Sequence, residues 1–377
     1  MKKKFCFCSA FLFLILFYAP LAGQLLLRHD TSYIPTIEKR IPHIFPEMPT
    51  ALSGLPEYIN KLDLYLSDHY GFRQHLLRLY NRLMFTLNIS GSQQVLLGGN
   101  GWLFLNKNEV VNQYRGSSSF SPDELREWIQ IMHTRKKWLA GLGIDFLVVI
   151  VPDKHSIYSK QLPSWATKVG KTSLELLHDT LEKKPLFSFL DLTPTLTNAK
   201  KQGPLYYQTD SHWNLFGAYY GYLAVINKLK PDHNTINKIL PKDVDFTFLE
   251  SPSKSLGKQL CVPQFFTEHN DVQTAFTKKT VLLDWAPRIV QTRDVQNARI
   301  PSVATTSLIE APRVLVIRDS FGNQMAPYLN QSFKEVLYCY NGFGFNKQSI
   351  ERSKPDIVIF MVVERLLKQR VLTAAQQ

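Results

Sequence analysis

Short apolar runs alternate with amphipathic stretches over most of the chain, and this alternation predicts a mostly parallel sheet covered by helices on both faces. Strands are expected where apolar and β-branched residues run continuously, at residues 102–105, 146–151, 187–191, 313–317, 335–340 and 356–363. Helices are expected where apolar residues recur at helical spacing, at residues 123–142, 173–183, 215–230 and 323–330. The predicted fold class is therefore α/β.

Two regions fall outside this alternation. Residues 57–88 carry apolar residues at helical spacing that is interrupted at residues 70–73, which predicts two further helices. Residues 231–311 are polar and less regular, so we expect an irregular insertion there that shapes the substrate side. Residues 57–377 are expected to form one domain, which is long enough to bury a large core without disulfides.

The beginning of the chain has the pattern of a membrane segment. Three lysines precede an apolar run from Phe5 to about Leu27, which is the length of a single span. This charge distribution predicts an N-terminus in the cytoplasm and the remainder outside. A cleaved signal peptide is the alternative, because small residues at 19–23 lie near the expected cleavage site. The length of the run favours an uncleaved anchor over residues 1–27, followed by a Pro-rich linker over residues 28–56.

An excess of basic residues bears on the possible partners. The chain has 44 Lys and Arg against 31 Asp and Glu, a formal net charge of +13. In an exported protein this charge either gives a generally basic surface or attracts an anionic polymer, such as a uronic-acid polysaccharide. No nucleic-acid-binding motif occurs. No cysteine and histidine spacing indicates a metal site, and Cys261 and Cys339 could pair or stay free.

Two separate segments contain the parts of an acyl-transfer site. Ser320 follows the expected strand at residues 313–317, at the carboxyl end where open α/β sheets bind ligands. Asp210 and His212 stand two residues apart, a spacing at which the carboxylate can orient the imidazole while its other nitrogen meets Ser320. His212 would be the base, and backbone N–H groups at the start of the next helix could stabilise the oxyanion. Each segment alone is commonly a helix cap or a surface pair, so the prediction rests on their joint occurrence.

Seven further side chains are candidates for contact with substrate. Three of them end another buried strand and should open onto the same crevice: Asp153, Lys154 and His155. Four others lie within or close after the two site segments: Trp213, Arg318, Asn323 and Tyr328. Each has a plainer structural interpretation as well. Asp153, Lys154 and His155 could lie in a helix cap or a loop, and Trp213 and Tyr328 could pack in the core. Arg318 could simply end its strand, and Asn323 could lie in the first turn of the next helix.

These motifs together resemble a known family. The segments that carry the resemblance are residues 100–105, Asp210-Ser211-His212-Trp213, Asp319-Ser320-Phe321, 354–360 and 363–365. They are similar to the SGNH-hydrolase-like O-acetyltransferases of bacterial exopolysaccharide biosynthesis, including alginate biosynthesis, which form the AlgJ/AlgX (DHHW) family. The resemblance covers roughly residues 60 to 370. It implies Ser320 as nucleophile, His212 as base and Asp210 as orienting acid.

The sequence also departs from ordinary SGNH hydrolases. The Asp-x-His pair precedes the serine, a circularly permuted order that matches the acetyltransferase branch. Arg318 replaces a glycine beside Asp319, and the second oxyanion donors of SGNH enzymes, a glycine and an asparagine, are not identifiable by spacing. Few residues follow Arg365, so no separate carbohydrate-binding domain is expected and the resemblance is closer to the AlgJ branch.

The resemblance implies a single-pass protein of the bacterial inner membrane whose catalytic domain faces the periplasm. This domain would transfer acetyl groups to hydroxyls of an exopolysaccharide, and the acetyl groups would come by way of a membrane-bound O-acyltransferase. Neither a bound cofactor nor a metal is implied. Two alternatives stay open: an acetyl esterase that uses the same triad with water as acceptor, and a non-catalytic polysaccharide-binding scaffold.

Overall fold

The computed structural model describes residues 40–277 except 88 and 108, residues 282–285, 302–340, 345 and 347–368, and a few isolated positions before residue 40. The chain forms two compact units. One comprises Met1–Val95 with Ser253–Phe266, and the other comprises Leu96–Pro252 with Thr267–Gln377. The predicted anchor over residues 1–27 lies almost entirely outside the described residues. Among the helices that are described, none combines the length and the apolar character that a membrane span requires.

The first unit is helical in its described part. Its α-helices are α2 (Leu55–His69), α3 (Arg73–Thr86) and α10 (Ser255–Gln259). Helices α2 and α3 confirm the two predicted between residues 57 and 88, and Phe72 between them has a left-handed backbone with φ of 60°. Asp68 near the end of α2 is buried and accepts hydrogen bonds from Arg40 and from the His43 backbone. The Arg40 guanidinium holds the pKa of this carboxyl well below its usual range.

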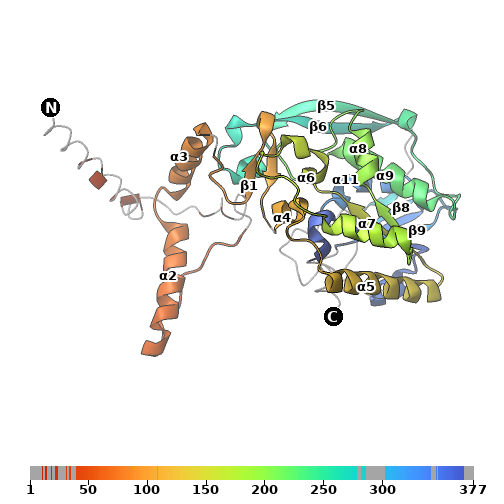
Figure 1. The fold of residues 1–377 in the computed structure, drawn as a ribbon, viewed down its shortest axis with the longest axis horizontal. Helices are drawn as coiled ribbons and strands as arrows, with labels where there is room; N and C mark the ends of the chain where they lie inside the picture. The colour runs from red at the N-terminus through yellow and green to blue at the C-terminus, as the bar shows by residue number, and fades with distance from the viewer. Residues whose placement is uncertain are drawn as a thin grey trace. The chain divides into compact units, whose positions relative to one another are not determined.

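The second unit is built around a seven-stranded sheet, part of which is labelled in Figure 1. The strands lie in the order β4-β3-β11-β9-β10-β8-β7. Their bounds are β3 (Asp145–Val151), β4 (Ser188–Asp191), β7 (Leu282–Trp285), β8 (Ser302–Thr306), β9 (Arg313–Arg318), β10 (Glu335–Tyr340) and β11 (Ile357–Val363). The five strands from β4 to β10 are parallel to one another, whereas β8 and β7 continue the sheet antiparallel. The predicted mostly parallel sheet is confirmed.

Helices cover both faces of this sheet, as predicted. One face packs against α5 (Pro122–Gly141), α7 (Ser173–Lys183) and α12 (Lys347–Ser353). The other packs against α4 (Val110–Arg115), α6 (Lys154–Ile157), α8 (Thr193–Ala199), α9 (Leu215–Leu229) and α11 (Gly322–Leu329). The central strands are buried on both sides, because successive residues along each strand point alternately into the two cores, and residues paired in register share a core. Val148 and Phe360 point into the first core, and Val149 and Met361 point into the second.

Local sequence signals explain where the helices begin. Ser121 accepts a hydrogen bond from the Glu124 N–H, and the Glu124 carboxylate accepts one from the Ser121 N–H. Thr172 and Glu175 form the same capping box at the start of α7. The helices and strands predicted between residues 102 and 363 differ from the observed ones by no more than one residue at either end. The pair predicted over residues 57–88 differs by two, since α2 begins at Leu55 and α3 ends at Thr86.

Two of the sequence-based expectations about strands were wrong. The stretch 231–311 is not irregular where it is described, because it contains the antiparallel pair β5 (Val244–Pro252) and β6 (Thr267–Phe276) as well as β7 and β8. Val244, Phe246 and Phe248 of β5 do alternate with polar residues, so a strand pattern is present over residues 244–248, although most of the strand is exposed. The strand expected at residues 102–105 exists as β2 (Leu103–Leu105), but it pairs with β1 (Val95–Leu97) in a separate two-stranded sheet.

Candidate active site

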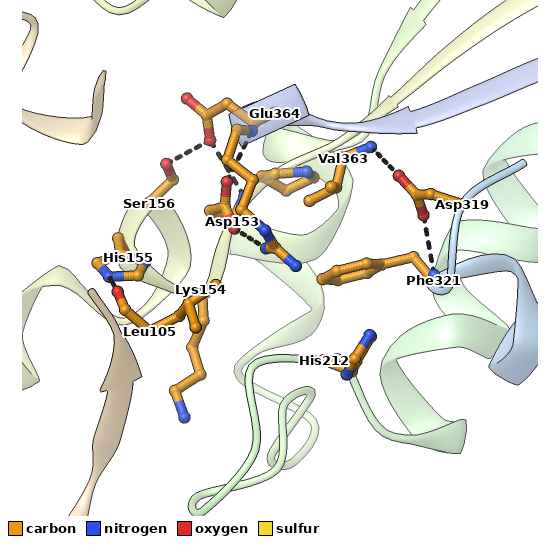
Figure 2. Close-up of polar contacts among 12 residues, drawn as sticks. Leu105, Asp153, Lys154, His155, Ser156, His212, Asp319, Phe321, Val363 and Glu364 are labelled. Atoms are coloured by element: carbon orange, nitrogen blue, oxygen red, sulfur yellow. Dashed lines mark hydrogen bonds and ion pairs between the residues drawn. The ribbon is translucent and has the colours of Figure 1, made fainter. Parts of the chain in front are cut away.

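Ser320 lies on the turn between β9 and α11, and Asp319 fastens this turn to the sheet. One Asp319 carboxylate oxygen accepts a 2.9 Å hydrogen bond from the Phe321 N–H, and the other accepts a 2.7 Å bond from the Val363 N–H of the neighbouring strand β11. Figure 2 shows the two bonds leaving the carboxylate in opposite directions. Burial raises the pKa of Asp319, while these two N–H groups favour its ionised form. Ser320 is thus presented at the carboxyl end of the sheet.

The structure brings the three residues of the predicted triad together. His212 Nε2 lies 2.8 Å from Ser320 Oγ, and His212 Nδ1 lies 2.6 Å from Asp210 Oδ1. The same Asp210 oxygen also accepts a 3.0 Å hydrogen bond from the His212 backbone N–H. The His212 side chain is 25% exposed and that of Asp210 is 14% exposed, so the imidazole can be reached from solvent. This geometry can pass the Ser320 proton to an imidazole whose orientation the carboxylate sets.

Trp213 and Phe321 join the two halves of this site. The Trp213 indole N–H donates a 2.9 Å hydrogen bond to the Phe321 carbonyl, and the Phe321 ring centre lies 4.8 Å from that of His212. Gly221 on α9 allows this packing, because a Cβ there would come within 2.7 Å of the indole. A buried hydrogen bond therefore links the chain directly after His212 to the chain directly after Ser320.

Lys154, His155 and Asp153 do not open onto a crevice, which corrects the expectation that they contact substrate. Each side chain is at most 3% exposed. The Asp153 carboxylate pairs with the Arg365 guanidinium and accepts a 2.8 Å bond from the Arg365 N–H. His155 Nε2 lies 3.0 Å from the Leu105 carbonyl, and burial lowers the pKa of this imidazole to about 4. The physical reason is that the chain turns into α6 directly after β3 and packs these residues inside the domain.

Trp213 and Tyr328 are also fully buried, so neither reaches a bound sugar. The Tyr328 hydroxyl donates a 2.8 Å hydrogen bond to the Leu215 carbonyl, within an aromatic cluster that includes Tyr219 and Phe276. Both aromatic residues have the core-packing role that was the plainer interpretation of the sequence.

Arg318 folds back over the nucleophile turn instead of extending toward solvent. Its guanidinium donates a 3.2 Å bond to the Asp319 carbonyl and lies 5.9 Å from the centre of the Tyr338 ring. Burial lowers the pKa of Arg318. Its aliphatic stem packs against Gly322, where an added Cβ would come within 2.7 Å of it. Asn323 is exposed in the first turn of α11.

The first N–H groups of α11 do not form the oxyanion site that the sequence suggested. The Phe321 N–H donates to the Asp319 carboxylate, the Gly322 N–H to the Asp319 carbonyl and the Asn323 N–H to the Ser320 carbonyl. Within the described part of the chain, no group accepts a hydrogen bond from the Ser320 N–H. The Ser320 amide is therefore the N–H of this turn that can meet a developing oxyanion.

Sequence reasoning missed two buried carboxylates near the site. Glu268 on β6 accepts hydrogen bonds from the loop that carries Asp210, and it lies in the stretch that was expected to be irregular. Glu364 accepts bonds from the Asp153 N–H at 3.1 Å and the Ser156 hydroxyl at 2.6 Å (Figure 2). Burial, with a smaller effect of Asp153, raises the pKa of Glu364 to about 7. Glu364 lies in the segment 363–365 that carried the resemblance, but its role was not predicted, and no motif marks Glu268. What distinguishes both glutamates is tertiary burial.

Neither a metal site nor a disulfide accompanies the triad in the described residues. No group of three or more His, Cys, Asp or Glu side chains among them is arranged to hold a metal ion. Cys261 and Cys339 are not joined by a disulfide.

A parallel α/β sheet with a serine at a strand end and a histidine and aspartate on a second loop defines the SGNH-hydrolase-like class of proteins. The chain belongs to the family described as "SGNH hydrolase-like domain, acetyltransferase AlgX", whose family model matches residues 95–348. The resemblance that the sequence motifs suggested is thereby confirmed at the level of the family.

Individual relatives agree with this assignment. The probable alginate O-acetylase AlgJ of Pseudomonas aeruginosa is 25% identical over 147 residues, which are 37% of this chain and 34% of that protein, so the chain spans about a third of its length. The structure of Bacillus cereus PatB1 with a sulfonyl adduct is similar with a TM-score of 0.55 and 18% identity, covering 74% of this chain and 99% of that chain. A DHHW family protein from Eubacterium siraeum has a TM-score of 0.52 and 14% identity, covering 74% and 98%. These two structures show that the fold is shared.

Proposed function

We propose that this protein is an O-acetyltransferase that transfers acetyl groups to hydroxyls of a bacterial exopolysaccharide through an acyl-enzyme on Ser320. The observation that carries the proposal is the 2.8 Å contact between Ser320 Oγ and His212 Nε2, with Asp210 on the opposite ring nitrogen. Family membership adds the chemical class, because the matched family is described as an acetyltransferase.

The geometry supports a transfer in two steps. In the first, Ser320 Oγ attacks the acetyl carbonyl of the donor while His212 Nε2 takes its proton, and the same nitrogen then returns that proton to the leaving group. In the second, His212 takes a proton from a sugar hydroxyl as its oxygen attacks the acetyl-serine, and Ser320 leaves with the proton. Asp210 holds the imidazole in one tautomer and stabilises the imidazolium that forms in both steps.

An acetyl esterase is the second candidate, and the partial exposure of the imidazole favours it. Because 25% of the His212 side chain is exposed, water can reach the place that an acceptor hydroxyl would occupy. The outcome depends on whether a bound sugar displaces that water. Hydrolysis and transfer would share the same acetyl-serine.

The test of this proposal uses the full-length protein, a chromogenic acetyl ester and a set of oligosaccharide acceptors of different charge. We expect mass spectrometry to detect acetylated oligosaccharide with the wild type and with the control variant Ser117→Ala, but not with Ser320→Ala. Ester cleavage without acetylated sugar for any acceptor would identify an esterase. Acetyl transfer by a folded Ser320→Ala variant would contradict the acyl-enzyme.

The location and partners of the protein complete the proposal. We infer that residues 1–27 anchor the chain in the inner membrane with the catalytic unit in the periplasm, where a membrane-bound O-acyltransferase supplies the acetyl group. The lysines before the apolar run and its length support the anchor, and the net charge of +13 supports an anionic polymer as acceptor. An anchored protein should stay with membranes after a carbonate wash and keep its first residues. N-terminal sequencing that begins near Gly23 would instead identify a cleaved signal peptide.

A further inference from the structure

The loop that carries the base is held from one side by a buried ammonium group. Lys154 Nζ donates hydrogen bonds to three backbone carbonyls of this loop, at 2.9 Å to Tyr207, 3.0 Å to Gln208 and 2.8 Å to Asp210. Three acceptors match the three N–H bonds of an ammonium ion, whereas a neutral amine offers only two. The geometry is therefore that of a charged lysine.

A buried carboxylate holds the same loop from the opposite side of its backbone. Glu268 is fully buried on β6 and accepts bonds from the Gln208 N–H at 2.8 Å, the Thr209 N–H at 2.8 Å and the Thr209 hydroxyl at 2.6 Å. Lys154 thus binds carbonyl groups of the loop, and Glu268 binds its N–H groups. Residues 207–212 lie outside the helices and longer strands, and their backbone is paired at few points, such as the Tyr207 N–H to the His212 carbonyl at 3.2 Å and the Leu103 N–H to the Gln208 carbonyl at 3.0 Å. The two charged side chains therefore add to a sparse set of backbone hydrogen bonds.

Both charged groups are buried, and the loss of hydration makes this unfavourable unless each group has specific hydrogen-bond or aromatic partners. Lys154 is 1% exposed, and its ammonium lies 5.1 Å and 5.0 Å from the ring centres of Trp102 and Phe104. Burial lowers the pKa of Lys154 to about 7, and the carboxylates of Asp210 and Glu268 oppose this shift. In Figure 2 the side chain extends away from the Asp153 and Glu364 carboxylates. A lysine buried only to fill space would be replaced at less cost by an apolar residue.

We propose that Lys154 and Glu268 are positioning residues that set the distance between His212 and Ser320, an inference that rests on the proposed function. Lys154 bonds to the carbonyl of Asp210, the residue whose carboxylate orients His212, and Glu268 holds the two residues before it. A displacement of about 1 Å at a catalytic group can lower the rate about 100-fold. Neither side chain touches the reacting atoms, so both act through the position of the loop.

The first measurement is the hydrolysis of a chromogenic acetyl ester by full-length variants. Lys154→Met keeps most of the side-chain length and removes the charge, and we expect it to lower kcat by about 10- to 100-fold while KM for the ester changes less than about threefold. Glu268→Gln keeps the shape and should lower kcat about 10-fold. Inactivation by a sulfonyl fluoride, which reacts with the activated serine, should slow by the same factors. An unchanged kcat in folded Lys154→Met would overturn the proposal.

The second measurement separates positioning from general loss of structure. If Lys154 acts through His212, then Lys154→Met should change the residual activity of a His212→Ala protein less than about twofold. A general structural role would lower the residual activity by the full factor seen in the wild-type background, and this result would also overturn the proposal. If Lys154→Met does not fold, the same cycle with Glu268→Gln and His212→Ala decides the question.

Tyr222→Phe is the matched control for stability. It removes a buried hydroxyl that lies 2.7 Å from Ser332 Oγ and accepts a 2.8 Å bond from the Ile239 N–H, away from the loop. This variant should lower the melting temperature and leave kcat within about twofold of the wild type. Failure of the proposed function gives a different result, in which His212→Ala and Ser320→Ala themselves retain activity.

Discussion

The nucleophile turn, residues 318–322, and the base loop, residues 207–213, are held in place in different ways. The nucleophile turn lies between β9 and α11, and Asp319 bonds it to the backbone of the neighbouring strand β11. The base loop lies between α8 and α9 and is held by side chains from β6, from α6 and from Trp213. Strand pairing in the sheet positions the serine. The histidine is positioned mainly by buried charges and one indole, with a few backbone hydrogen bonds such as that from the Tyr207 N–H to the His212 carbonyl.

This difference predicts which substitutions affect stability and which affect activity. A strand end in a buried parallel sheet moves only if the sheet moves, so damage there should lower the free energy of unfolding as well as the rate. A loop held by a few side-chain and backbone hydrogen bonds can shift by a fraction of an ångström while the domain stays folded. The base loop is therefore where we expect the rate to change with a smaller loss of stability.

The largest expected effect is the loss of the triad itself, which would test whether the two regions act as one unit. Ser320→Ala and His212→Ala should each lower turnover of an acetyl ester by roughly 1000-fold or more, because neither residue activates the reaction without the other. The double variant should be little worse than either single variant, and Asp210→Ala should cost somewhat less. Steady-state kinetics on folded variants would measure this. Effects that multiply in the double variant would show that the serine and the histidine act independently.

The next effect concerns the nucleophile turn. Asp319→Ala leaves the Phe321 and Val363 N–H groups buried without an acceptor, which costs about 1 to 3 kcal/mol of folding free energy for each. We expect urea unfolding to show this loss together with a reduced rate. Asp179→Ala, at an exposed ion pair with Lys171, should change stability by less than about 0.5 kcal/mol. If Asp319→Ala lowered the rate without lowering stability, the contrast between the two regions would be lost.

A smaller effect is expected at the contact that joins the two regions. Trp213→Phe removes the 2.9 Å hydrogen bond to the Phe321 carbonyl but keeps an aromatic ring beside Gly221. Such a bond contributes about 0.5 to 1.5 kcal/mol, so kcat should fall by up to about 10-fold with little change in KM. Trp165→Phe, at a side chain that is 54% exposed, is the control and should leave kcat unchanged. A KM effect larger than the kcat effect would instead indicate that Trp213 binds substrate.

The smallest expected effect is a pH dependence of stability near the nucleophile turn. Because burial raises the pKa of Glu364 from 4.5 to about 7, the folded protein holds a proton between these values that the unfolded chain releases. Stability from this group therefore falls as the pH rises through that window. The melting temperature of Glu364→Gln relative to the wild type should rise between pH 5 and pH 8, on the order of 3 °C.

His155 has the opposite pH dependence, because burial lowers its pKa to about 4, but it is present in both proteins and cancels from the difference. Glu127→Gln, at an exposed position of α5, is the control and should show no such trend. A difference between Glu364→Gln and the wild type that stays constant from pH 5 to pH 8 would contradict the raised pKa.

The sequence by itself was sufficient for the parallel strands, for the longer helices and for the triad residues, but not for β5 to β8. Parallel strands buried on both faces are continuous apolar runs, so β3, β9 and β11 could be recognised without a structure. The capping box at Ser121 and Glu124 marked the start of α5. Ser320, His212 and Asp210 could be identified because the reaction requires these residue types, and strand ends meet at one edge of a parallel sheet.

Only the tertiary structure decided which of the other polar residues face the site. Lys154 and Glu268 are 114 positions apart in the chain, and no local pattern shows that both would be buried against the same loop. Asp153 and His155 follow a strand as Ser320 does, yet α6 turns them inward and the same positional argument failed for them. A residue's position at a strand end follows from local sequence. The burial of its side chain depends on which distant segments pack over it, and that is a property of the whole fold.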